Sequence, residues 1–168
     1  SESAGQLQVE PCTVQGDVAL IGGQAYPAKV AQLRQRLLVR IKQHGFGETM
    51  EAIAYTWFNR FAALRYMELH DYLGHGQRVL SSVNPDSLPD ILTHALELVE
   101  GGDLPGISRD DVAELKLAGK DGELYKHLLV AQCNKLASAM PFLFERIDDD
   151  SELLLPDNLL RSDSVIAK

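Results

Sequence analysis

The stretch AYTWFNRFAALRYMEL, residues 54–69, constrains the fold more than any other part of the sequence. It holds the chain's single Trp, and at about 100° per residue its apolar side chains fall on nearly every side of a helix. A helix with this pattern is buried on most of its circumference, which requires other helices around it. We therefore predict a mainly α protein, a compact bundle of about five or six helices with this stretch as its hub.

Charged side chains interrupt the apolar surface of this helix at Arg60, Arg65 and Glu68. Buried charges are tolerated when they are paired and hydrogen-bonded. Arg65 and Glu68 are three residues apart, so they lie on adjacent turns of one face. We predict that Arg60, Arg65 and Glu68 form a structural ionic core that ties the helix to its neighbours. A polar pocket for a ligand is the alternative.

Helix signals recur along the rest of the chain. Apolar residues at three- and four-residue steps mark buried faces, and Ser87 with Asp90 and Ser108 with Asp111 have the spacing of capping pairs. The predicted helices cover residues 28–44, about 48–72, 87–99, 108–118 and 121–140.

Residues 1–26 differ from the helical part. Apolar and polar residues alternate over short runs, and Gly16-Asp17 and Gly22-Gly23 are turn signals. This pattern predicts a short β-hairpin or an arm before the first helix.

The charge of the chain is unevenly distributed. The net charge of −8 argues against a surface that wraps nucleic acid as a whole. Residues 27–44 nevertheless carry five basic residues and no acid, and on a helix Lys29, Arg36 and Arg40 lie within roughly 20° of the same direction. With Lys42 on the polar side of the helix, these residues are our candidates for contacting DNA phosphates. An ordinary solvated helix face is the alternative.

Several classes of protein lack support in the sequence. There is no run of 18 apolar residues and no signal peptide, so we expect a cytoplasmic chain without a membrane partner. Cys12 and Cys133 fall in no metal or redox motif and are expected to be free thiols. No Ser-His-Asp set, Walker loop or G-x-G-x-x-G after a strand occurs. We therefore predict no catalytic, cofactor-binding or metal-ligating residue in this chain.

Four ordered segments carry a family resemblance: AYTWFNRFAALRYMEL, RVLSS, LLVAQCNKLASAMPFLFE and ELLLPDNLLRSDSVIAK. Together they resemble the amino-terminal region of the large adenine-specific DNA methyltransferases of the PglX type. These enzymes belong to BREX phage-exclusion systems and are related to fused restriction-modification enzymes. The likeness covers about residues 27–168.

The resemblance implies a parent enzyme that transfers a methyl group from S-adenosylmethionine to the N6 amine of adenine. The family's Asn-Pro-Pro-Tyr motif is absent here, since Asn84-Pro85 is followed by Asp86. No catalytic residue can therefore be carried across, and S-adenosylmethionine is expected in the parent enzyme but not in this part. We expect an arm or hairpin at 1–26, a helical domain at 27–161, and at 162–168 the start of a linker helix to a missing methyltransferase domain.

Two functions fit these features. The first is a non-catalytic helical domain that supports the engagement of duplex DNA through the basic helix. The alternative is a docking module that packs on the remaining methyltransferase domains or on another protein of the defence system.

Overall fold

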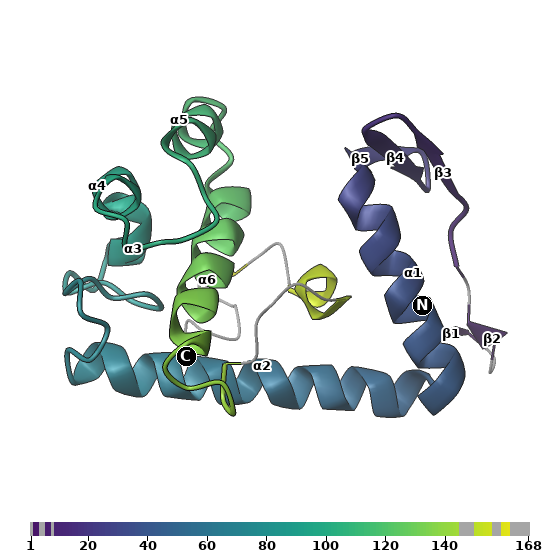
Figure 1. Ribbon diagram of the computed structural model, residues 1–168, viewed down its shortest axis with the longest axis horizontal. Helices are drawn as coiled ribbons and strands as arrows, with labels where there is room; N and C mark the ends of the chain where they lie inside the picture. The colour runs from purple at the N-terminus through teal and green to yellow at the C-terminus, as the bar shows by residue number, and fades with distance from the viewer. Residues whose placement is uncertain (1, 4–5, 8, 145–149, 156–158, 162–168) are drawn as a thin grey trace. The chain divides into compact units, whose positions relative to one another are not determined.

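The computed structural model describes residues 2–3, 6–7, 9–144, 150–155 and 159–161. Its elements are β1 (Glu2–Ser3), β2 (Gln6–Leu7), β3 (Cys12–Gln15), β4 (Val18–Ile21), β5 (Gln24–Pro27), α1 (Ala28–His44), α2 (Phe46–Leu69), α3 (Asp90–Thr93), α4 (Ala95–Glu100), α5 (Arg109–Leu117), α6 (Asp121–Ala137) and the 3-10 helix η1 (Asp150–Leu154). Among the described residues all strands precede α1 (Figure 1). The prediction of a mainly α chain with β structure at its amino terminus is confirmed.

The described residues divide by their contacts into two units. The first contains the residues up to Tyr55 together with η1, and the second contains the residues from Thr56 onward apart from η1. Helix α2 begins in the first unit and ends in the second. The division into an arm at 1–26 and a helical domain at 27–161 stays a prediction, and the linker helix at 162–168 lies outside the described residues.

The first unit is built on a small antiparallel sheet with the strand order β3-β4-β5. Gly16, with φ 58°, lies in the turn between β3 and β4, and Gly22 and Gly23, with φ 56° and 84°, form the next turn. These positive φ values favour glycine because they crowd a Cβ atom. Ala19 on the central strand is fully buried, and α1 packs on the sheet. The predicted hairpin is thus extended by a third strand, from which α1 continues directly (Figure 1).

Helix α1 has the predicted bounds. Its apolar face points inward, with Leu33 and Ile41 buried. Gly45 ends the helix with φ 85° and donates its N–H to the Ile41 carbonyl at 2.8 Å. The 3-10 helix η1 packs against α1 within the same unit.

Helix α2 has one buried face. Its buried residues follow four- and three-residue steps: Thr49, Ile53, Trp57, Arg60, Leu64 and Glu68. The opposite face is exposed, with Phe58 at 67% and Tyr66 at 57% of their full accessible surface. The prediction that this helix is buried on most of its circumference is therefore wrong. Its apolar residues form two faces, and the described residues cover one of them.

Helix α6 forms the core of the second unit. Leu124, Leu128 and Leu129 along it are fully buried, and α3 and α5 pack against it. Helix α4 packs against α5 in turn. None of the described helices combines the length and the apolar character that a membrane span requires.

The capping predictions had opposite outcomes. Ser108 and Asp111 form the predicted capping box at the start of α5. The predicted helix from Ser87 is instead interrupted at His94 into α3 and α4, and Pro89 stands at the N-cap without a side-chain cap. The Asp90 carboxylate does not complete a capping box with Ser87, because it binds residues 82 and 83.

Candidate interaction surfaces

The polar centre of the second unit is the carboxylate of Glu68, whose side chain has no exposed surface. Its Oε2 accepts the backbone N–H groups of Val79 and Leu80, both at 2.8 Å. Its Oε1 accepts the Ser81 hydroxyl at 2.9 Å and pairs with the Arg65 guanidinium. An ionised carboxylate accepts about four hydrogen bonds, so this group is saturated. Glu68 joins α2 to the segment that follows it.

A second carboxylate, Asp90, holds the next part of the same segment. It accepts the Ser82 hydroxyl at 2.5 Å and the Val83 N–H at 3.2 Å. Its own N–H donates to the Ser81 carbonyl at 3.0 Å. The sequence predicted no contact for these serines. These hydrogen bonds join the Asp90 side chain to residues seven and eight positions earlier in the chain, a spacing that no helix-capping pattern predicts.

Arg60 and Arg65 lie in different surroundings. Arg60 is 2% exposed and its guanidinium stands over the Trp57 ring, 5.1 Å from the centroid. Arg65 has a side chain that is 49% exposed, and it also donates to the Ser81 hydroxyl at 2.8 Å. The ionic residues of α2 therefore contribute a buried cation–π contact and a half-exposed ion pair. Arg65 and Glu68 join α2 to residues 79–81 of the same unit, and Glu68 has no vacant acceptor for a ligand.

Cys133 and Tyr125, both on α6, are the buried titratable groups beside this centre. Burial raises the pKa of the Cys133 thiol to about 12, although nearby Arg60 opposes the shift. Burial, and then the Glu68 charge, raise the pKa of Tyr125, whose hydroxyl donates to the Val79 carbonyl at 2.9 Å. Both groups stay protonated at neutral pH, which makes the thiol a poor nucleophile. Cys12 and Cys133 are free, as predicted.

His75, in the segment that follows α2, is hydrogen-bonded on both ring nitrogens. The Gln77 N–H donates to Nδ1 at 3.1 Å, which places the ring proton on Nε2, 3.1 Å from Oε1 of Gln132. Burial lowers the pKa of His75, and the hydrogen bond to Gln132 opposes this shift. Gly74 and Gly76 on either side have positive φ values of 80° and 72°. No sequence spacing links residue 75 to residue 132.

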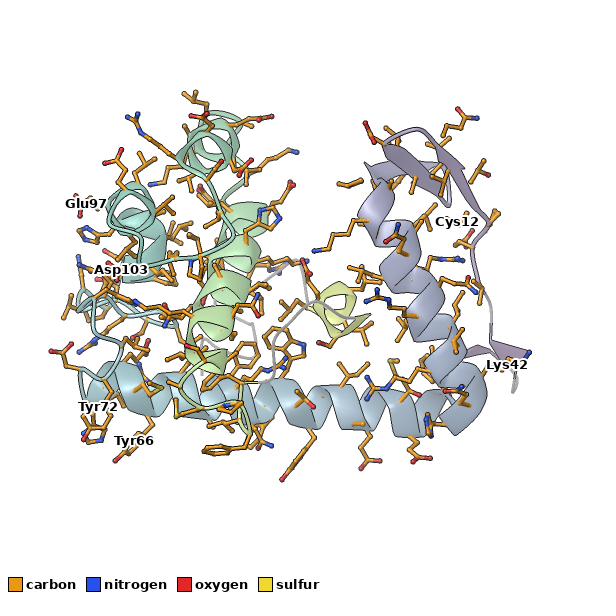
Figure 2. The ribbon with its side chains drawn as sticks, in the orientation of Figure 1. Cys12, Lys42, Tyr66, Tyr72, Glu97 and Asp103 are labelled. Atoms are coloured by element: carbon orange, nitrogen blue, oxygen red, sulfur yellow. The ribbon has the colours of Figure 1, made fainter. Side chains whose placement is uncertain are left out.

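The basic candidates lie in the first unit, on α1. Lys29, Arg36 and Arg40 recur at seven- and four-residue steps, so they form one row along the helix. Lys29 is 60% exposed and pairs with Glu152 of η1 at 3.8 Å. Lys42 is exposed near the end of α1 (Figure 2) but lies about 140° around the helix from Lys29. The structure therefore aligns three of the four candidates.

An exposed aromatic face lies on the part of α2 that belongs to the second unit. We define it by Phe58, Ala62, Tyr66 and Leu69 of α2 together with Tyr72, three residues beyond the end of the helix, all of which are exposed. Two of its members, Tyr66 and Tyr72, form a cluster with His70, in which the ring centroids are 4.3 Å (Tyr66–His70), 5.6 Å (His70–Tyr72) and 6.1 Å (Tyr66–Tyr72) apart. Figure 2 shows Tyr66 and Tyr72 on the side of α2 that points away from α6.

Among the described residues no group of three His, Cys, Asp or Glu side chains could hold a metal ion.

The fold and these surfaces define a helical scaffold with a saturated polar centre, a basic row and an uncovered aromatic face. The chain is 44% identical over 167 residues to the adenine-specific methyltransferase BrxX of Escherichia coli O9:H4 (strain HS). It is 37% identical over 135 residues to the adenine-specific methyltransferase PglX of Lacticaseibacillus casei (strain Zhang). The resemblance to PglX-type methyltransferases is thereby confirmed, and the chain is related to a part of them.

That part is small. The alignments include 99% and 72% of this chain, but the chain spans only 14% of BrxX and 11% of PglX. No protein-family model matches the chain.

Proposed function

We propose that this chain is the amino-terminal, non-catalytic region of an adenine-N6 DNA methyltransferase of a BREX phage-exclusion system, and that it helps the enzyme to engage duplex DNA. The observation that carries the DNA role is the row of Lys29, Arg36 and Arg40 on α1, a helix that contains no acidic residue. The two relatives are named adenine-specific methyltransferases, which supports the assignment of the parent enzyme.

A DNA-gripping region suits the chemistry of such an enzyme. A base inside a duplex must be flipped out of the stack before its N6 amine can be methylated, and this costs a few kcal/mol. Contacts to the phosphate backbone hold the duplex in register while the base leaves the stack. The row from Lys29 to Arg40 extends over roughly 16 Å of helix, enough for contacts to several phosphates.

We assign S-adenosylmethionine binding to other parts of the parent enzyme. Two-residue turns that contain glycine join β3 to β4 and β4 to β5, and β5 leads straight into α1, so no glycine-rich cofactor loop follows any of these three strands. Asn84, in the chain's Asn-Pro sequence, forms a turn in which its carbonyl accepts the Ser87 N–H at 3.0 Å. These residues do not fit a methyl-donor site.

The DNA role is tested by charge reversal. We expect the triple variant Lys29→Glu, Arg36→Glu and Arg40→Glu to weaken duplex binding by the 168-residue chain at low salt. The slope of log K against log salt should become shallower by about 0.9 for each phosphate that the variant no longer neutralises, or up to about 2.7 for three. The matched control reverses Arg109, Lys116 and Lys120, which lie in and beside α5. Equal effects of the two triples, or no effect of the α1 triple, would overturn the DNA role.

Docking on the rest of the methyltransferase is a second role of the same region, and the exposed aromatic face favours it. This face is on α2 and the basic row is on α1, so the two roles can be tested separately.

A further inference from the structure

We infer that the aromatic face of α2 is a docking surface for an apolar protein surface in the remainder of the methyltransferase polypeptide. This inference rests on the proposal that the chain is a part of such an enzyme. The residues of the aromatic face make the contact, and the surface that covers them is apolar.

The face is apolar and strongly exposed. Phe58, Tyr66, Leu69 and Tyr72 have 67%, 57%, 54% and 61% of their surface accessible. Phe58, Ala62, Tyr66 and Leu69 follow steps of four, four and three residues, which places them in one continuous stripe. Contiguous exposed apolar surface on a folded chain marks a site of interaction, whereas isolated exposed apolar residues do not.

The two faces of α2 explain its composition. One face is buried in the described chain around Trp57 and Leu64, and the other consists of aromatic and aliphatic side chains that the described chain leaves open. Solvent-facing helix positions are ordinarily polar. Large aromatic side chains on an outer face are typical of interface cores, where Tyr and Phe are enriched.

The electrostatic surroundings favour a protein over a nucleic acid. Stacking of bases on aromatic side chains is normally combined with a basic groove that follows the phosphates. Residues 56–144, which include the aromatic face, contain more acidic than basic residues. Arg65, the nearest cation on the helix, is held by Glu68 and Ser81. An uncharged apolar partner fits this face better than a polyanion does.

The size of the stripe favours a partner in the same polypeptide. A stable complex of separate proteins buries about 800 Å² on each partner, contributed by about 20–30 residues a side, whereas five residues define this face. A covalently attached partner is present at an effective concentration in the millimolar range, so a small apolar contact is sufficient. The relative BrxX provides such a remainder, since this chain spans 14% of its length.

The inference is tested by thiol labelling in the absence of DNA. Ala62→Cys places a thiol in the middle of the stripe with little change in volume, and Phe58→Cys is a second variant. The background carries Cys12→Ser, and Cys133 is buried and unreactive. A charged maleimide is reacted with the intact methyltransferase and, separately, with the 168-residue chain. The matched control is Leu117→Cys, at a residue of α5 that is 90% exposed.

We expect residue 62 to react at least about tenfold more slowly in the intact methyltransferase than in the chain, because buried interface cores exclude water. Leu117→Cys should react equally in both. Equal rates at residues 58 and 62 in the two proteins would overturn the inference. Protection in the chain alone that rises with its concentration would show a second copy instead, and protection only on addition of single-stranded DNA would show a nucleic-acid site. If the α1 charge reversal did not change duplex binding, the DNA role would be wrong, but slower labelling of residue 62 in the intact methyltransferase would still support docking.

Discussion

At the scale of single residues, Glu68 shows how an acidic side chain can be fully buried when hydrogen bonds occupy both of its oxygens. Two backbone N–H groups, a hydroxyl and a guanidinium occupy its oxygens. Hydrogen bonds to the charged form offset the cost of removing a carboxylate from water. The backbone of residues 79 and 80 would lose its acceptor if this group were removed.

We expect Glu68→Ala to lower the free energy of unfolding by about 3 kcal/mol, because two buried N–H donors would be left without a partner. Arg65→Ala should cost less, about 1 kcal/mol, because this guanidinium is half exposed and the Glu68 carboxylate keeps its other three hydrogen bonds. Urea unfolding followed by the fluorescence of Trp57 measures both values within the second unit. A larger cost for Arg65→Ala than for Glu68→Ala would contradict this account of the polar centre.

We expect His75 to affect how the stability of the second unit depends on pH. Burial lowers the pKa of its imidazole in the folded state, so the unfolded chain takes up a proton at a higher pH than the folded chain does. Stability is therefore lost as the pH falls below the ordinary histidine pKa of about 6.5. We expect the melting temperature to fall less between about pH 7.5 and 5.5 in His75→Gln than in the unsubstituted chain. His94→Gln, at a residue whose side chain is 39% exposed, is the control.

At the scale of secondary-structure elements, local signals were sufficient where the structure uses local contacts. The apolar period and Gly45 define α1, and the Ser108–Asp111 box defines the start of α5. The Ser87–Asp90 pattern failed because Asp90 binds residues 82 and 83, which no spacing rule connects to it. Periodicity predicted that α2 is apolar on nearly every side, but it could not show which sides the rest of the chain leaves exposed.

The pairing of α1 with η1 leads to a prediction about DNA binding. Glu152 of η1 lies 3.8 Å from Lys29, the first residue of the basic row, and an acidic group at this position competes with a phosphate. Half-exposed ion pairs contribute up to about 1 kcal/mol, so we expect Glu152→Gln to strengthen duplex binding by up to about fivefold at low salt. Glu97→Gln removes one negative charge elsewhere and is the control. Equal gains in both variants would show a general charge effect rather than local competition.

At the scale of the whole molecule, the candidate surfaces occupy different units. The basic row belongs to the first unit, and the polar centre and the aromatic face belong to the second. The sequence predicted the basic row, because helical spacing alone aligns Lys29, Arg36 and Arg40. It could not predict the aromatic face as a surface, because exposure depends on which segments pack together in the folded chain.

The proposed function places methyl transfer and S-adenosylmethionine binding in other parts of the parent enzyme. If methyl transfer takes place elsewhere, the 168-residue chain should bind duplex DNA weakly but transfer no labelled methyl group to it from S-adenosylmethionine. The melting temperature should also stay unchanged on addition of S-adenosylmethionine, because a ligand that binds the folded state raises it by mass action. The intact methyltransferase is the positive control for both measurements. A rise in melting temperature of the chain alone would place a methyl-donor site within these 168 residues and contradict the assignment of that site to the remainder.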